Sequence, residues 1–258
     1  MNYIERRPRL TGVHGVRLES AEPLSALAFY ATMTHRRGQP STELGARMHS
    51  FAGRGFRVQP KEDPAGSPWT LAFGTTSTDD TVAACLALGA VELDNPYDDG
   101  WRVMLDPLGT RFAVVMAEDE QPSIPSEGEL SLADLYTWHV DDATKFYSEA
   151  LLLEIDLQPD EHAHNFPLGE PIDYVKFSSM SRHVAGVIDM ASFAPPETHE
   201  QWIPYLHFAN VDTGLERATA LGAWVLVPKM QTPTGNYALM QDPWGNLFGL
   251  WDAASLST

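Results

Sequence analysis

Apolar residues recur along the chain with two spacings, one typical of helices and the other of strands. From Ala143 to Leu151 the apolar positions are three or four residues apart, which places them on one face of a helix. The same spacing predicts helices over 24–33, over 81–88 and around Leu215. Shorter apolar runs bounded by glycine, proline or polar residues predict strands. These runs are 70–73, 132–137, 205–209, 224–227, 236–240 and 247–251.

The chain also repeats itself, because motifs of the first half return in the same order in the second half. The recurring pairs are Phe29-Tyr30 with Phe146-Tyr147, Leu88-Gly89-Ala90 with Leu221-Gly222-Ala223, and Asp106-Pro107-Leu108-Gly109 with Asp242-Pro243-Trp244-Gly245. Repeated motifs in conserved order indicate two copies of one structural unit.

The two copies meet in a polar stretch, 118–128, which contains proline and serine and has the composition of a linker. We therefore predict two domains, 1–120 and 129–258. Each copy divides again into a strand, a helix and several further strands, so the predicted fold is α+β with tandem βαβββ modules. The second copy is longer between its first two motifs, and we expect a lost or shortened strand around 48–58 in the first.

This plan resembles the vicinal oxygen chelate superfamily, which includes glyoxalases, bleomycin-resistance proteins and dioxygenases. The similarity rests on the Phe-Tyr helix, the Asp-Pro-x-Gly turn, and segments 202–208 and 232–237, and it covers nearly the whole chain. It implies two glyoxalase-like domains, each a curved mixed sheet around a cup-shaped cavity. The resemblance alone does not define a reaction, because one fold hosts many functions.

The resemblance also implies where the enzymes of the superfamily hold a divalent metal. Hard divalent metals need carboxylate or imidazole ligands, and the residues at the implied positions provide neither. We therefore expect no metal and disfavour a glyoxalase or dioxygenase reaction. A shift of one residue in the alignment would bring His14 into the site, so a metal enzyme stays open as a further alternative. The implied positions are Gly15, Thr70, Ala113, Leu132, Ile203 and Gly249.

Side chains alternate along a strand, and this predicts which residues face each cup. For the second cup they are Asp134, Tyr136, Tyr205, His207 and Trp251. His207 could act as a general base, with Asp134 orienting it or Tyr205 donating to an oxyanion. The alternative is that these groups satisfy one another in a polar core. We expect this second cup to be the main ligand site.

For the first cup the alternation predicts Arg17 and Glu19 on the inner face. A mutual ion pair is the simplest structural explanation for them. Tyr97 and Trp101 come from the nearby hairpin, where either ring closes over a ligand or covers the core. We include Arg17, Glu19 and Trp101 among the candidate ligand-binding residues.

Composition narrows the choice of partners. The formal net charge is −18, which argues against binding to nucleic acid or to an anionic membrane. The single cysteine, Cys85, excludes an internal disulfide and a cysteine-rich zinc site. No apolar run reaches the length of a membrane span, and Met1 to Leu10 lacks the apolar core of a signal peptide, so we expect a cytoplasmic protein.

The favoured hypothesis is a protein that binds a small aromatic or hydrophobic organic molecule without metal, as in the sequestration of a natural product or drug. The alternative is a metal-independent lyase, isomerase or cyclase that uses His207, Asp134 and Tyr205 as catalytic residues. No glycine-rich phosphate loop or Rossmann fingerprint is present, so no cofactor is expected. A homodimer stays open, as does the question of whether each cup forms within one domain or between the two.

Overall fold

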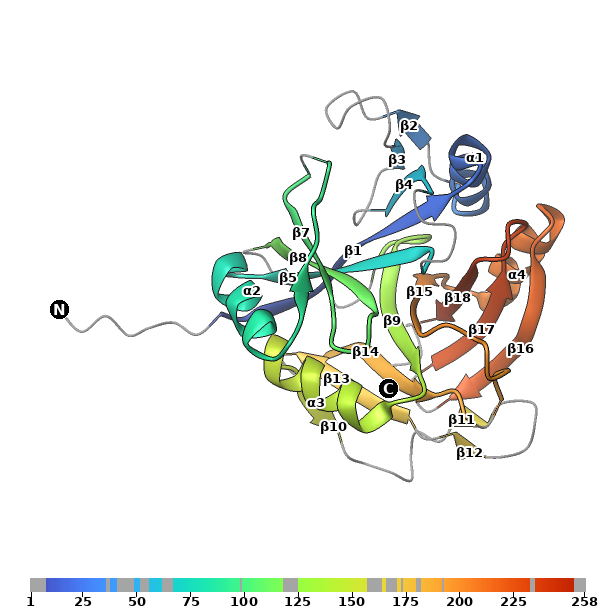
Figure 1. Ribbon diagram of the computed structural model, residues 1–258. Coiled ribbons are helices and arrows are strands. Elements are labelled where there is room, and N and C mark those ends of the chain that lie inside the picture. Colours follow the sequence, from blue (N-terminus) through green and yellow to red (C-terminus); the bar gives the residue numbers. More distant parts are fainter. Residues whose placement is uncertain are drawn as a thin grey trace.

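Two mixed β-sheets of eight strands each form the framework of the chain, as the computed structural model shows (Figure 1). Each sheet takes all its strands from one half of the sequence, so each cup forms within one copy of the repeat. The structure describes residues 8–35, 38–40, 49–51, 56–61, 67–97, 99–117, 125–156, 164–165, 171–172, 174–179, 182–191, 193–232 and 235–252.

The first sheet has the strand order β2-β3-β4-β1-β5-β8-β7-β6. At its centre β1 runs parallel to β4 and antiparallel to β5, and β5 runs parallel to β8. Its strands are β1 (Leu10–Ser20), β2 (Gly38–Pro40), β3 (His49–Phe51), β4 (Phe56–Pro60), β5 (Trp69–Thr75), β6 (Val91–Glu92), β7 (Trp101–Leu105) and β8 (Arg111–Met116).

The second sheet has the equivalent order β10-β13-β14-β9-β15-β18-β17-β16, with the same parallel and antiparallel pairs at its centre. The two sheets therefore confirm the repeat and the α+β class that the motifs predict. The strands are β9 (Leu130–Thr137), β10 (Glu154–Asp156), β13 (Tyr174–Ser179), β14 (Arg182–Asp189), β15 (Gln201–His207), β16 (Trp224–Thr232), β17 (Gly235–Gln241) and β18 (Leu247–Asp252).

All four predicted helices are present: α1 (Pro23–Met33), α2 (Thr78–Ala87), α3 (Val140–Leu151) and α4 (Val211–Ala220). The strands expected to be lost or shortened in the first copy are shortened, and none is lost. β3 and β4 have three and five residues, whereas β13 and β14 have six and eight. The second copy also carries a small extra sheet, β11 (His164–Asn165) with β12 (Pro171–Ile172).

The first helix of each copy packs against the other copy. α1 contacts α4 of the second copy as well as β3 and β4 of its own sheet, and α3 contacts α2 of the first copy (Figure 1). The Phe29 ring of α1 meets the edges of Trp244 and Phe248, 6.1 Å away in each case. One apolar core therefore joins the two copies. The predicted domain boundaries remain a prediction, because residues 118–124 lie outside the described residues.

Two buried hydrogen bonds cross between the copies in equivalent places. Tyr30 donates to Asp242 Oδ2 and Tyr147 donates to Asp106 Oδ2, each at 2.9 Å. Both carboxylates open the repeated Asp-Pro-x-Gly turn, and both tyrosines belong to the repeated Phe-Tyr pair. The motifs that reveal the repeat thus form the contact that joins its copies.

Within the described residues, no helix is long and apolar enough to cross a membrane.

Candidate functional site

The face of each sheet turned away from the shared core carries a cavity, and the two cavities differ greatly in size. The pocket of the second sheet has a volume of about 10 Å³, which is room for about one water molecule. The cavity of the first sheet has a volume of about 240 Å³. Space for an organic molecule is therefore found in the first cup.

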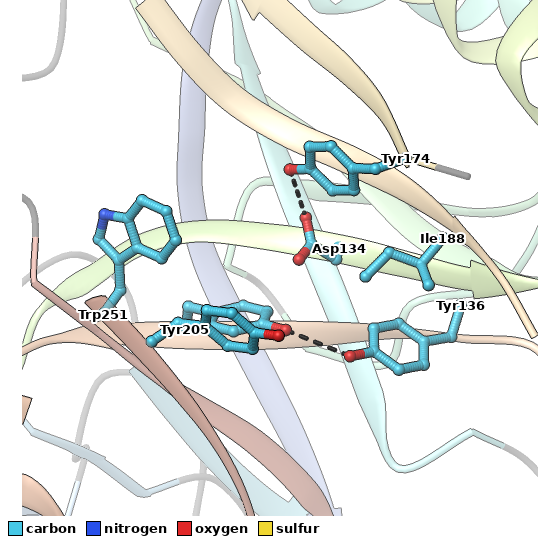
Figure 2. A pocket seen from close by; sticks show the side chains of 7 residues that line it. Asp134, Tyr136, Tyr174, Ile188, Tyr205 and Trp251 are labelled. Carbon is cyan, nitrogen blue, oxygen red and sulfur yellow. Dashed lines mark hydrogen bonds between the residues drawn. The ribbon is translucent and has the colours of Figure 1, made fainter. Parts of the chain in front are cut away.

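Aromatic side chains fill the second cup (Figure 2). Asp134, Tyr136, Tyr205 and Trp251, four of the residues that alternation places there, do line the pocket together. The tyrosine hydroxyls of Tyr136 and Tyr205 lie 3.3 Å apart. Tyr174, Ile188 and Tyr237 complete the lining from strands β13, β14 and β17.

The ring of Tyr205 occupies the space above Gly249 on the adjacent strand. A Cβ atom on Gly249 would lie 2.0 Å from Cδ1 of this ring. Gly186 has a similar role beneath Tyr174, whose hydroxyl oxygen would lie 2.3 Å from an added Cβ. The second cup is therefore closed because two glycines leave room for two tyrosine rings.

Asp134 is the buried acid of this closed cup. Tyr174 donates to Asp134 Oδ1 at 3.1 Å and also lies 2.8 Å from Nε2 of His183. Burial raises the pKa of the Asp134 carboxyl to about 7, against the opposing effect of hydrogen bonds from Tyr174 and Tyr205. Burial also raises the pKa of Tyr205 well above its usual value, so its hydroxyl stays protonated at neutral pH.

His207 does not line this pocket, although it lies on the same strand as Tyr205. Burial lowers its pKa, and the charged groups that oppose this shift are Asp252, Glu127 and Glu129 rather than Asp134. Its Nδ1 atom is buried without a hydrogen-bond partner in the described part of the chain. The structure thus brings Asp134 and Tyr205 together and leaves His207 apart from them.

The first cup contains the residues predicted for it, in a different ionic arrangement. Arg17 and Glu19 both line the cavity, with Tyr97, Val103 and Arg111. Arg17 pairs with Asp99, and Glu19 pairs with Arg111. Gln59 also donates to Glu19, from Nε2 to Oε1 at 3.0 Å.

Asp99 organises one side of this cup and was not predicted from the sequence. Its side chain is fully buried, and it accepts from Arg17, from Arg57 at 2.8 Å, and from the Trp101 backbone N–H at 3.1 Å. The Arg17 guanidinium carbon lies 4.7 Å from the Trp101 ring centroid and 5.1 Å from that of Tyr97. Trp101 therefore makes a cation–π contact with Arg17 and does not itself line the cavity.

Comparisons with known proteins agree with this geometry. Residues 15–115 match the glyoxalase-like domain family. In its fold the whole chain is similar to glyoxalases and dioxygenases of known structure. These structures align over almost the whole chain, at identities that establish the fold alone. No curated protein sequence is significantly similar to it.

Three of these structures illustrate the relationship. The Mn(II)-bound glyoxalase from Novosphingobium aromaticivorans has a TM-score of 0.64 and 14% identity, over 95% of this chain and 83% of that one. The 2,3-dioxygenase LapB from Pseudomonas sp. KL28 has a TM-score of 0.63 and 15% identity, over 94% and 91%. A catechol 2,3-dioxygenase has a TM-score of 0.61 and 14% identity, over 94% and 93%.

The metal positions of the superfamily can be tested against the strand register. Gly15 pairs with Ala72, which pairs with Ala113. In the second sheet Leu132 pairs with Tyr205, which pairs with Gly249. The middle strand of each row thus contributes Ala72 and Tyr205, two residues away from the predicted Thr70 and Ile203.

Neither row fits a divalent metal. The first offers no side-chain donor atom, and the second offers only a tyrosine hydroxyl that stays protonated. His14 lies at an irregularity in the β1–β5 pairing, between Val13 and Gly15. In the described ranges, no three His, Cys, Asp or Glu side chains come together in a way that could hold a metal ion.

Proposed function

We propose that this chain binds a small organic molecule in its first cup, without a metal at the superfamily's position. The observation that carries the proposal is the difference in volume between the cups, about 240 Å³ against about 10 Å³. A small-molecule site needs a concave space with apolar walls and a few placed polar groups. Only the larger of these two cavities has room for such a molecule.

The lining of the first cup supports an amphipathic ligand. Tyr97 and Val103 contribute apolar surface, while Arg17, Glu19 and Arg111 contribute charge. Arg17 and Glu19 are each held by an ion pair, so their positions are fixed before a ligand arrives. The proposed role is binding or sequestration of a natural product or drug-like molecule.

The proposal departs from the activities named for the similar structures. Those proteins are described as a Mn(II)-bound glyoxalase and as 2,3-dioxygenases. The paired rows at the implied metal positions contain no carboxylate and no imidazole, and this favours a function that does not use a metal there. The rows are Gly15-Ala72-Ala113 and Leu132-Tyr205-Gly249.

A metal-independent acid–base enzyme is the second candidate, and the observation that favours it is Asp134. A carboxyl group with a pKa of about 7, among tyrosine hydroxyls, is suited to move a proton near neutral pH. Tyr205 would first have to swing away from Gly249 to admit a substrate. Loss of turnover in Asp134→Asn, with ligand binding unchanged, would favour this candidate.

The experiment compares three proteins in a thermal-shift screen of small aromatic compounds, with a chelator present throughout. Val103→Trp fills the first cup, and Tyr237→Phe is the matched change in the lining of the second. We expect wild type and Tyr237→Phe to be stabilised by the same compounds, and Val103→Trp by none. Stabilisation that persists in Val103→Trp, or that requires added Mn²⁺, would refute the proposal.

A further inference from the structure

The arginines of the first cup outnumber its buried carboxylates. In the part of the chain that the structure describes, Arg17 and Arg111 line the cavity. Arg17 shares the carboxylate of Asp99 with Arg57, and Arg111 pairs with Glu19. Each carboxylate side chain is at most 7% exposed, so both are committed to ion pairs inside the protein. The cup thus holds one excess positive charge in a chain whose net charge is −18.

The remaining acid at the cavity does not cancel this excess. Asp94 lines the mouth and is exposed to solvent. Water and salt screen an exposed charge far more than a buried one. The interior of the cup therefore favours a negative ligand group.

Arg111 is the arginine placed to meet that group. It lines the cavity and its side chain is 18% exposed. A guanidinium carries five N–H donors, and the described contacts of Arg111 use Nη1 alone, which donates to Glu19. The Glu19 bond fixes the guanidinium, and its other donors can form the paired hydrogen bonds that a carboxylate accepts.

The floor of the cup also carries polar atoms whose hydrogen bonding is incomplete. Arg17 Nε and Gln59 Oε1 belong to residues that line the cavity, and both atoms are buried without partners among the described residues. Buried polar groups are nearly always satisfied by protein, water or a ligand. Two such atoms at one cavity indicate that it is built for a polar occupant as well as an apolar one.

Resting on the proposed function, we infer that the ligand is an organic carboxylate whose apolar body lies against Tyr97 and Val103 and whose carboxylate meets Arg111. A neutral or cationic molecule of the same shape leaves the excess positive charge unmatched. The first cup should therefore rank ligands by charge as well as by shape.

The test uses three probes of nearly equal shape, which are phenylacetate, phenylacetamide and 2-phenylethylamine, in calorimetric titrations at pH 7 with chelator. We expect phenylacetate to bind at least about tenfold more tightly than the amide, and the amine to bind most weakly. Equal binding of amide and carboxylate, or preference for the amine, would overturn the inference while leaving the first cup as a binding site. Absence of binding by all three, while other compounds bind, would also overturn it.

Variants connect the selectivity to Arg111. Arg111→Gln should reduce the affinity for phenylacetate at least about tenfold and leave the affinity for phenylacetamide unchanged. Arg111→Lys keeps a partner for Glu19, and its affinity for phenylacetate should lie between those of wild type and Arg111→Gln. Arg102→Gln is the matched control, since Arg102 lies on the neighbouring strand β7 and pairs outside the cavity with Glu92 and Asp79. An equal loss for amide and carboxylate in Arg111→Gln would contradict the assigned contact.

Discussion

Tyr147→Phe tests the contact that joins the two copies, because it removes one oxygen atom and keeps the ring. The Tyr147 hydroxyl donates to Asp106 Oδ2 at 2.9 Å and accepts from Trp202 Nε1 at 3.2 Å. A hydrogen bond to a charged group contributes about 1.5–3 kcal/mol, and a buried donor left without an acceptor costs about 1–3 kcal/mol. We therefore expect the free energy of unfolding to fall by about 3 kcal/mol or more.

Tyr30→Phe is the matched control in the other copy. Tyr30 makes the equivalent bond to Asp242, but Asp242 Oδ2 also accepts from Asn246 at 2.8 Å. The tryptophan equivalent to Trp202, Trp69, donates to the Leu247 carbonyl and does not depend on the tyrosine. Tyr30→Phe therefore loses one bond to a carboxylate that keeps another donor, and should cost about 1–2 kcal/mol.

The assay is urea unfolding at equilibrium, followed by circular dichroism, for wild type and both variants at one pH. The predicted order is wild type, Tyr30→Phe, Tyr147→Phe, with decreasing stability. Equal costs in the two variants, or a cost of Tyr147→Phe below about 0.5 kcal/mol, would show that the hydroxyls do not couple the copies as described.

Three further predictions concern the second cup and the metal. Because burial raises the pKa of Asp134 to about 7, the folded chain holds this proton more tightly than the unfolded chain. The contribution of Asp134 to the free energy of unfolding should therefore fall by roughly 4 kcal/mol as pH rises from about 4 to about 7, and Asp134→Asn should remove this fall in urea unfolding. Gly249→Ala places a Cβ 2.0 Å from the Tyr205 ring and should cost about 1–3 kcal/mol, and less in a Tyr205→Ala background. Chelator treatment should leave the melting temperature unchanged, and Mn, Fe or Zn in stoichiometric amount after dialysis would refute this.

Periodicity was sufficient for the four helices and for part of the inner faces of the sheets, since His207 does not line the pocket of the second sheet. The spacing of apolar residues identified all four helices, and alternation placed Arg17, Glu19, Asp134 and Tyr205 on cavity linings. These features depend on local geometry, in which a helix or a strand directs side chains by a fixed rotation per residue. The repeat then fixed which strands correspond.

Whether a cup is open or filled by side chains depends on packing between neighbouring strands, and alternation along one strand does not specify that packing. Tyr205 closes the second cup because Gly249 lies opposite it in the pairing of β15 with β18. Counting residues from a motif does not give the pairing between strands, so Thr70 and Ile203 were assigned to rows that Ala72 and Tyr205 occupy. We also placed the main ligand site in the second cup, whereas the larger cavity lies in the first.

The ion-pair partners of Arg17 in the first cup could not be predicted from the sequence either. Asp99 comes from the segment between β6 and β7, and Arg57 lies opposite Arg17 on the neighbouring strand β4, so both reach Arg17 only after folding. Acidic residues are common in this chain, so Asp99 carried no distinguishing signal.

The most direct measurement of the central claim is a crystal structure with a compound from the thermal-shift screen, grown in the presence of chelator. We predict density for one molecule in the first cup, in contact with Tyr97, Val103 and Arg111, with the Tyr205 ring still over Gly249. A compound bound beside Asp134 with Tyr205 displaced, or a metal ion between compound and protein in either cup, would contradict the account.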